Sequence, residues 1–444
     1  MRHQILFTLL ALPAALAAAA PASSSASSAL HAAIEQDYDA RLAPLFDHFH
    51  RNPELSYMEV KTAARLAAEL REAGFTVTEK VGKTGVVAIL KNGPGPLVMM
   101  RADMDGLPVE EKSGLANASK VIMKDQTGRD VPVTHACGHD VHMTALVGAG
   151  RRMAAMKSQW KGTLMLIGQP AEERGGGARD MMADNIWQRF GKPDAALSLH
   201  VFSGIEAGKI DVSEAPYSGS DTIEIVVRGV GAHGASPHTS KDPVVIGAQI
   251  VMALQTVVSR ELSPREPGLI TVGSFHAGSK ANIISDSATL ELTVRSESAA
   301  TRDLLVNAVK RVALHTARAA GVAENMQPEV RNIDDPVLPV LNDMPLAARV
   351  KAAWTEQLGP GVFAKGFKRE AMVAEDFARF TASPYIPSVY YTIGGTPLAQ
   401  LKASERDGTP VPGNHSPLFK VIPDASIKGA VATAVVALLE MFRK

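Results

Sequence analysis

The sequence predicts an α/β fold in two parts: a larger domain around a central mixed sheet, and a smaller ferredoxin-like α+β domain inserted into it. Three observations predict this. Helical and strand-like segments alternate from about Ala29 onward, which is typical of a sheet covered by helices. Between residues 218 and 333 the order becomes β-α-β-β-α-β, the ferredoxin-like pattern. After Asp334-Asp335-Pro336 the first alternation resumes and continues to Lys444.

The larger domain is assigned to residues 29–217 and 334–444. Its first predicted helix is Ala43–Ala73, and Gly74 fits a C-terminal cap. Two strands (85–90 and 97–100), a helix (Thr144–Met156) and two further strands (163–168 and 195–201) follow. These strands are nearly continuous apolar runs, so we expect the sheet to be buried on both faces.

The inserted domain is assigned to residues 218–333, and its elements follow one another closely. The predicted strands and helices, in order, are 222–229 (strand), 242–259 (helix), 269–275 and 287–296 (strands), 300–321 (helix) and 328–332 (strand). Junctions between domains commonly bound active-site clefts, so we expect one here.

The overall charge excludes some classes of partner. The 444 residues are 46% apolar, and 46 Lys and Arg balance 46 Asp and Glu. A chain of zero net charge has no basic field for nucleic acid or for an anionic membrane surface.

The N-terminus, residues 1–28, has the pattern of a secretory signal peptide with a Ser-rich spacer. A basic start, an apolar run and small residues lead to a predicted cleavage around Ala20 or Ala22. The alternative is an uncleaved anchor, but Pro13 and the many alanines make a poor membrane helix. We expect an exported protein, periplasmic or secreted, and no later segment that could span a bilayer.

Chemically active side chains follow several of the predicted strands. Asp105 comes soon after the strand at 97–100, Glu172-Glu173 after the strand at 163–168, and His200 at the end of the strand at 195–201. Ligands of open α/β sheets gather at the carboxyl ends of strands, so these groups are expected to share one crevice. Cys137 and His139 precede a predicted helix, from which they could reach the same edge.

Cys137 is the only cysteine in the chain. It could be a buried thiol, an intermolecular bridge, a nucleophile or a metal ligand. Thiolate and imidazole in Cys137-Gly138-His139 suit zinc, and also cobalt, nickel or manganese in mixed sites. Glu172-Glu173 is an acidic pair whose members can point in different directions, one toward a metal and the other toward a substrate water. The alternative interpretation of this pair is a solvent-exposed acidic turn without a catalytic role.

Other catalytic motifs are absent or fail in context. The GxGxxG match at 229–234 is followed by Pro237 and Pro243, which interrupt any immediate helix, so it does not indicate a dinucleotide site. The motifs G-x-S-x-G and H-E-x-x-H do not occur.

Five segments together resemble a known family. MRADMDGLPV (100–109), HACGHDVH (135–142), QPAEE (169–173), GVGAHGASPH (229–238) and GNHSP (413–417) are similar to motifs of the dinuclear metallo-amidohydrolases of the aminoacylase/carboxypeptidase superfamily. The branch is the one with hippurate hydrolases, N-acyl-amino-acid amidohydrolases and indole-acetyl-amino-acid hydrolases. The resemblance covers roughly residues 32–440.

The resemblance implies a metallopeptidase-like catalytic domain, a lid and dimerisation domain, and two divalent ions per subunit, Zn²⁺ or Mn²⁺, with Co²⁺ or Ni²⁺ as further options. It implies that Cys137 bridges the ions and that His139, Glu173, His200 and His415 complete their coordination. The roles implied for the other residues are general base and acid for Glu172, support of a ligand histidine for Asp105, oxyanion stabilisation in a partner subunit for His233, and substrate contact for Asn282 and Arg295. A homodimer or a dimer-based tetramer is implied in the same way.

Two departures from the family pattern bear on specificity. Ser285 stands where the family usually has proline, near Asn282, and the segment Leu115–Val133 looks lengthened and could reshape the pocket mouth. Among the neighbouring residues, His135 and His142 are expected to be packed or supporting histidines. Glu375-Asp376 match a family motif, but the sequence assigns them no role.

The function we expect is metal-dependent hydrolysis of the amide bond in N-acyl amino acids by a water activated between the two metals. The alternatives are an exported dipeptidase or carboxypeptidase of the same superfamily, and a non-catalytic metal- or peptide-binding protein. The intact Glu172 argues against the last.

Overall fold

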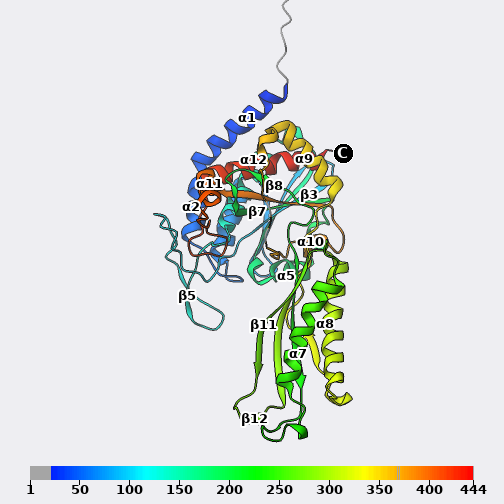
Figure 1. The fold of residues 1–444 in the computed structure, drawn as a ribbon. Coiled ribbons are helices and arrows are strands. Elements are labelled where there is room, and N and C mark those ends of the chain that lie inside the picture. The colour runs from blue at the N-terminus through cyan, green and yellow to red at the C-terminus, as the bar shows by residue number, and fades with distance from the viewer. Residues whose placement is uncertain (1–21, 368, 370, 444) are drawn as a thin grey trace, which may run out of the picture.

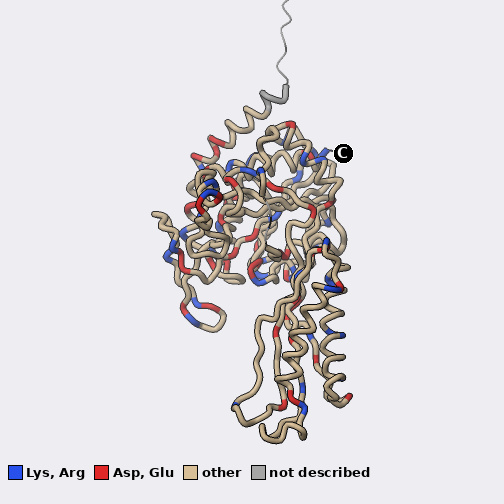
Figure 2. The backbone as a smooth tube through the Cα atoms, viewed as in Figure 1, with Lys and Arg blue, Asp and Glu red and all other residues tan. Residues whose placement is uncertain are grey.

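The computed structural model describes residues 22–367, 369 and 371–443. Most of the expected signal peptide, residues 1–21, therefore lies outside the described residues. The fold has two parts, and the smaller one projects from the larger one as a long arm (Figure 1). Figure 2 shows basic and acidic residues interspersed along the backbone of both parts.

The larger part is built on a seven-stranded mixed sheet in the order β1-β2-β6-β3-β7-β15-β8. Strands β6, β3, β7 and β15 run parallel, whereas β1, β2 and β8 pair antiparallel at the edges. The strands are Thr76–Val81 (β1), Gly85–Asn92 (β2), Leu97–Asp103 (β3), Gly162–Gln169 (β6), Ala195–Glu206 (β7), Ile210–Asp211 (β8) and Ser388–Thr396 (β15). The central four are buried along most of their length, as their apolar runs predict.

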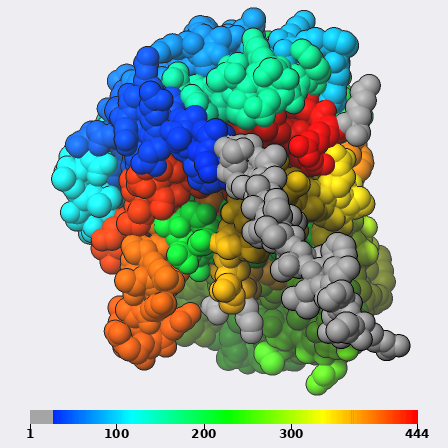
Figure 3. Space-filling view, turned by 90° about the horizontal axis from the view of Figure 1, so that it is seen from above, coloured from blue at the N-terminus to red at the C-terminus, as the bar shows by residue number. Residues whose placement is uncertain are grey.

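Helices cover both faces of this sheet and close two apolar cores. The larger core lies under Ala22–Asp37 (α1), Ala43–Arg51 (α2), Val60–Glu72 (α3), His139–Ala155 (α4), Met344–Leu358 (α9) and Pro423–Phe442 (α12). The smaller core lies under Gly177–Ala183 (α5), Ile186–Phe190 (α6) and Ala378–Thr381 (α10). Helix α11 (Leu398–Asp407) lies outside both cores. The first and last helices pack side by side, where Lys428 Nζ lies 2.6 Å from Glu35 Oε1 (Figure 3).

The smaller part has the expected ferredoxin-like order. Its antiparallel sheet runs β11-β13-β9-β14, and two helices cover one face. The elements are Gly219–Arg228 (β9), Pro243–Thr256 (α7), Gly268–Ala277 (β11), Ser287–Ser296 (β13), Ala299–Ala319 (α8) and Glu329–Asn332 (β14). A short ribbon of Ala232–His233 (β10) and Ile283–Ile284 (β12) lies at the far tip (Figure 1). We call residues 219–332 the lid.

The predicted helix Ala43–Ala73 is wrong as a single element, because α2 ends at Arg51 and α3 begins at Val60. Pro53 lacks a backbone N–H, and Tyr57 has φ 67°, so the chain turns between the two helices. This turn carries Ser56, which reaches the functional site described below. The predicted cap at Gly74 is confirmed by its φ of 89° and by the bond from Phe75 N to Leu70 O.

Two other expectations need correction. The helix predicted from Thr144 begins five residues earlier, at His139, because Gly138 with φ 84° turns the chain directly into it. Two helices are also long and apolar enough to cross a membrane by length and composition, namely Pro243–Glu261 and Pro423–Phe442. The second is a core helix of the larger part, 78% buried, whereas the first lies on the lid and is 33% buried.

Candidate metal centre

The carboxyl ends of three parallel strands bring the predicted site residues together. Strand β3 ends at Asp103, β6 ends at Gln169 and leads into the short turn Glu172–Arg174, and β7 carries His200. Asp103 and Gln169 are partners in the β3/β6 register. Helix α4 starts at this edge with His139, so that the predicted convergence at one edge of the sheet holds.

Two sets of donor atoms share the thiol of Cys137. One set is Cys137, His139 and His200, and the other is Cys137, Glu173 and His415, with the donor atoms of each set within 4.8 Å of one another. Sγ of Cys137 lies 3.4 Å from Nε2 of His200 and 3.2 Å from Nε2 of His415. Nε2 of His415 is 3.3 Å from Oε1 of Glu173. The structure therefore gathers all five predicted ligands around one sulfur.

Two buried polar atoms in this cluster test whether a metal fits. Nε2 of His139 and Oε1 of Glu173 are buried and have no hydrogen-bond partner among the described residues. Buried polar groups are normally hydrogen-bonded, so atoms left without a partner call for a ligand. Thiolate, imidazole and carboxylate are the donors that zinc and similar divalent ions take. The residues present fit a two-metal centre.

The ligand histidines are oriented by backbone carbonyls. His139 donates from Nδ1 to the carbonyl oxygen of Asp105 at 2.8 Å, and His200 donates from Nδ1 to the carbonyl oxygen of Val201 at 2.7 Å. Each bond fixes the tautomer and leaves Nε2 with its lone pair directed into the cluster.

Asp105 holds the acidic turn in place. Its carboxylate accepts hydrogen bonds from the backbone amides of Glu172 and Glu173, both at 3.1 Å, and from the Ser56 hydroxyl at 2.6 Å. It is 1% exposed, and Oδ1 lies 3.4 Å from Nδ1 of His139. Asp105 thus supports a ligand histidine, as expected, and it also orients the glutamate pair.

Glu172 lies beside the donor sets, and its Oε2 is 3.9 Å from Nε2 of His139. Burial raises the pKa of Glu172 well above its usual value, and the nearby carboxylates of Glu375 and Glu173 raise it further. A buried carboxyl group next to a metal cluster and open to a cavity is placed for general acid–base work.

A buried arginine organises the carboxylates behind Glu172, and the sequence analysis missed it. Arg101, 0% exposed, donates to Asp103 at 2.8 Å and to both oxygens of Glu375 at 2.8 and 3.1 Å. Asp103 in turn accepts from His142 Nδ1 at 2.5 Å, which confirms His142 as a supporting residue. An arginine inside a buried strand is a sequence signal for such a network, because a buried guanidinium requires carboxylate partners.

A second buried network supports the segment that carries Cys137 and His139. His50 lies 2.7 Å from Asp140 and 3.3 Å from Glu111. Burial alone would lower the pKa of His50, but its hydrogen bond to Asp140 and its ion pair with Glu111 raise it to about 10. Burial alone would raise the pKa of Glu111, but the nearby His50 lowers it to about 2. Helix α2 and the segment after β3 are thereby tied to the start of α4.

The cluster opens into a cavity of about 990 Å³ between the two parts of the chain. Cys137, Glu172, Glu173, His200 and His415 line one side, and Ser220, Thr222, Leu269, Thr293 and Arg295 of the lid line the other. The lengthened segment forms a hairpin of two short strands, Ile122–Lys124 (β4) and Asp130–Pro132 (β5), which points away from the larger part (Figure 1). The residues that line the cavity come from other segments.

Arg295 is a cation in this cavity without a carboxylate partner among the described residues. Its Nε donates to the Thr293 hydroxyl at 3.2 Å, and burial lowers its pKa from the usual value. A half-buried guanidinium that faces a cavity and lacks an ion pair is available to an anionic ligand.

His233 and Asn282 lie elsewhere, on the ribbon at the lid tip. Strand β13 separates this ribbon from Arg295, and a strand rises about 3.3 Å per residue, so the tip is roughly 30 Å from the cavity. Both residues are exposed. The structure does not bring them to the metal centre of their own chain.

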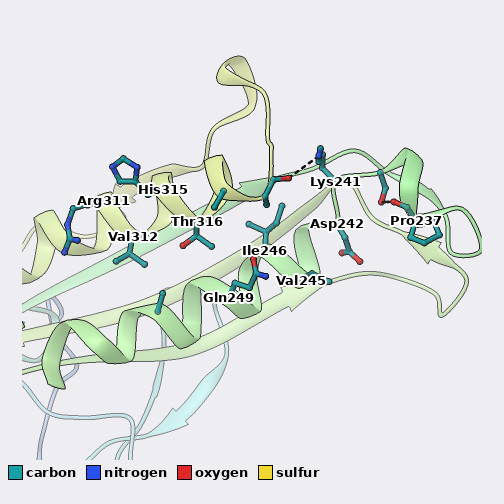
Figure 4. Close-up of a pocket in the computed structure, with 14 residues that line it drawn as sticks. Pro237, Lys241, Asp242, Val245, Ile246, Gln249, Arg311, Val312, His315 and Thr316 are labelled. Carbon is teal, nitrogen blue, oxygen red and sulfur yellow. Dashed lines mark hydrogen bonds between the residues drawn. The ribbon is translucent and has the colours of Figure 1, made fainter. Parts of the chain in front are cut away.

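A second cavity, of about 890 Å³, lies on the lid between α7 and α8 (Figure 4). Asp242, Gln249, Arg311 and His315 are among its lining residues. None of the donor clusters found in the described residues falls there.

The fold and the site define the class of this protein: a metal-dependent hydrolase of amide bonds, with a carboxylate beside residues that could hold metal ions and a cavity between the larger part and the lid. The chain belongs to the peptidase family M20/M25/M40, whose model matches residues 99–405.

Individual relatives agree with this class. The chain is 33% identical to thermostable carboxypeptidase 2 of Saccharolobus solfataricus over 88% of its length and 92% of that protein. It is also 33% identical to hippurate hydrolase of Campylobacter jejuni over 78% of its length and 86% of that protein. Among solved structures, a dinuclear metal binding peptidase of the M20 family from Bacillus subtilis matches with a TM-score of 0.72 and 27% identity, covering 93% of this chain and 99% of that one.

Proposed function

We propose that this protein hydrolyses the amide bond of N-acyl amino acids, using two divalent ions held by Cys137, His139, Glu173, His200 and His415. The observation that carries the proposal is the cavity itself, which places Glu172 and the metal cluster opposite the unpaired cation Arg295. The hippurate hydrolase to which the chain is similar acts, by its name, on such a substrate.

Ions bound at this cluster would polarise the scissile carbonyl and lower the pKa of water, and Zn²⁺ or Mn²⁺ suits the donors. Glu172 takes a proton from the attacking water and returns it to the leaving amine, because its carboxylate lines the cavity beside the two donor sets that share Cys137 and belongs to neither of them. The amides bonded to Asp105 keep Glu172 and Glu173 pointing in their separate directions.

The two ends of the substrate are recognised by different parts of the cavity. Arg295 binds the carboxylate of the amino acid, since its guanidinium has five donors and forms no ion pair with an acid among the described residues. The acyl group lies toward the apolar lining residues Phe202, Met372 and Val373. A free carboxylate and an apolar acyl group are therefore the features that the cavity selects.

We further propose a homodimer, or a dimer-based tetramer, in which His233 and Asn282 act at the site of the partner subunit. A residue about 30 Å from its own cavity on a rigid sheet cannot reach it, so it serves another copy or none. Helix α7 carries exposed apolar side chains, with Val245 52% and Met252 70% exposed. Strand β11 is an edge of the lid sheet and offers unpaired backbone groups beside that helix.

We also propose export to the periplasm or the medium, supported by the basic and apolar pattern of residues 1–28. N-terminal sequencing of the protein recovered from fractionated cells tests this. A start near Ala20 or Ala22 in the exported fraction supports it, and an intact N-terminus in the cytosolic fraction contradicts it.

The substrate class is tested by hydrolysis assays on purified, metal-analysed protein. N-acetyl and N-benzoyl amino acids are compared with free dipeptides, and N-benzoylglycine is compared with N-benzoylglycinamide. We expect the acyl amino acids and the free acid to be preferred, and Arg295→Met to abolish the preference for the acid. Preference for free dipeptides or longer peptides would favour the peptidase alternative, to which the similarity with a carboxypeptidase points.

The catalytic and subunit assignments have separate tests. Glu172→Gln should retain two metal equivalents but lose roughly 1,000-fold in kcat, as expected for loss of a general base.

If His233 acts in the partner, mixing inactive Glu172→Gln with inactive His233→Ala should restore activity, because one site in each mixed dimer is then complete. No recovery in mixed dimers would show that His233 does not act at the site of the partner subunit.

A further inference from the structure

Tyr217 lies at the point where the larger part, the lid and the metal cluster meet. It lies two residues before the lid strand β9, and its carbonyl accepts a hydrogen bond from the backbone amide of Val340 in the returning chain at 3.0 Å. Its ring centroid is 5.9 Å from that of His200 and 4.9 Å from that of Tyr390. With 5% of its surface exposed, Tyr217 is held in one orientation by this packing.

The hydroxyl group of Tyr217 has no hydrogen-bond partner within the described part of the chain. Two other buried tyrosines differ in this respect: Tyr390 donates to Glu375 at 2.6 Å, and the Tyr391 hydroxyl is 2.9 Å from that of Thr433. Buried tyrosines usually find a partner, because an unpaired polar group costs free energy. The Tyr217 hydroxyl is not one of the fully buried, unpartnered polar atoms of the described residues, so it reaches the cavity that Tyr217 lines, where a ligand can accept its hydrogen bond.

Tyr217 lines the same cavity as Cys137, Glu172 and His200, beside which the reacting carbonyl must lie. Burial raises the pKa of the Tyr217 phenol, and the charges of Cys137 and Glu172 are near enough to raise it further. The guanidinium of Arg369 lies 5.0 Å from the centroid of the ring. A cation on an aromatic face draws electron density from the ring, which makes the phenol a better hydrogen-bond donor.

We propose that the Tyr217 hydroxyl donates a hydrogen bond to the oxygen of the scissile carbonyl as that oxygen gains negative charge, in the same subunit as the metal cluster. The inference rests on the proposed amide hydrolysis. It adds a donor that the sequence motifs do not contain and that needs no partner subunit. No proton is transferred, because the phenol keeps its hydrogen throughout and only strengthens its bond as charge develops.

Tyr217→Phe tests the proposal, since it removes the hydroxyl and keeps the packed ring. Loss of one preorganised donor to a developing oxyanion reduces kcat by roughly 100-fold, while KM stays within about threefold because the bond forms fully only in the transition state. Tyr391→Phe is the matched control: another buried tyrosine, in the strand next to β7, whose hydroxyl bonds to Thr433 in the opposite core. We expect it to leave kcat unchanged.

The same assays distinguish failure of this inference from failure of the proposed function. If wild-type protein hydrolyses N-benzoylglycine and Tyr217→Phe retains its kcat, only the donor role of Tyr217 is overturned. A change in KM alone, or a loss of activity that follows a loss of bound metal or a lower Tm, also overturns it. If wild-type protein hydrolyses no acyl amino acid, the proposed function is wrong and the inference falls with it.

Discussion

Gly138 separates the two neighbouring ligands Cys137 and His139, and its replacement by alanine tests how the cluster is built. The residue has φ 84° and ψ 23°, the left-handed region, which costs an alanine roughly 1 kcal/mol. A Cβ at this position would also lie 2.2 Å from Cγ1 of Val201, far inside van der Waals contact. Overpacking of this kind costs about 1–3 kcal/mol more.

Gly74 provides a matched control. It has φ 89°, close to the φ of Gly138 and equally unfavourable for alanine, but a Cβ there would have no atom within 4 Å. Gly74→Ala should therefore lower the free energy of unfolding by about 1 kcal/mol, and Gly138→Ala by about 2–4 kcal/mol. The difference isolates the contact with Val201, because the backbone term is common to both.

Urea denaturation and metal analysis measure the outcome. Gly138→Ala should also bind metal more weakly than Gly74→Ala, since relief of the contact must move Cys137, His139 or the strand that carries His200. Adding Val201→Ala to Gly138→Ala should recover part of both losses, which is a non-additive result in a double-mutant cycle. Equal destabilisation by the two glycine substitutions, or strict additivity with Val201→Ala, would refute this reasoning.

Three further predictions concern the buried networks and the thiol. Arg101→Met should destabilise the protein by about 3–5 kcal/mol in urea denaturation, because it leaves Asp103 and Glu375 buried without their cation; unchanged stability would contradict the network. Cys137→Ser should lower the metal content and the activity together. Full metal loading in that variant would show that the sulfur is not a ligand shared by the two donor sets. The ion pair of His50 and Glu111 should stabilise the folded protein fully between pH 4.5 and 6.5. This stabilisation is lost as the pH rises through about 10, where His50 loses its proton, and as the pH falls through about 2, where Glu111 gains a proton. His50→Gln should accordingly destabilise the protein more at pH 6 than at pH 10, and an equal effect at both would exclude the pair.

The parts of the site that the sequence predicted are those with a local signal. Glu172, Glu173 and His200 follow buried apolar runs, and the rule that strand ends meet at one edge is sufficient to gather them. Cys137 and His139 share one turn, so a single short motif indicates both. His415 is separated from Cys137 by 278 residues, and no local pattern could pair them; only the family resemblance placed it.

The parts that the sequence missed depend on pairing between distant segments. Arg101 could be suspected of needing counterions, but Glu375 lies 274 residues away and its side chain direction depends on how β15 and α10 pack. Tyr217 occupies an irregular linking segment, where neither helical nor strand periodicity predicts the face on which a side chain lies. The break between α2 and α3 was overlooked because both helices continue the same apolar pattern.

The arrangement of the site divides metal binding from turnover between different parts of the protein. All five proposed metal donors and Glu172 come from the larger part, so one chain supplies the whole proposed cluster without the lid. Arg295 faces the same cavity from the lid, and Tyr217 from the segment that joins the two. Arg295 and the lid tip lie on the same sheet, so a motion that brings Arg295 closer to the cluster turns the whole lid about the segments beside Tyr217. Such a rotation cannot bring His233 across roughly 30 Å into the same cavity. Metal loading should therefore be independent of protein concentration, whereas any contribution of His233 to kcat must disappear on dilution to the monomer. The turnover that a monomer retains would then come only from groups of its own subunit, and comparing it between the wild type and Tyr217→Phe would measure the donor proposed for Tyr217.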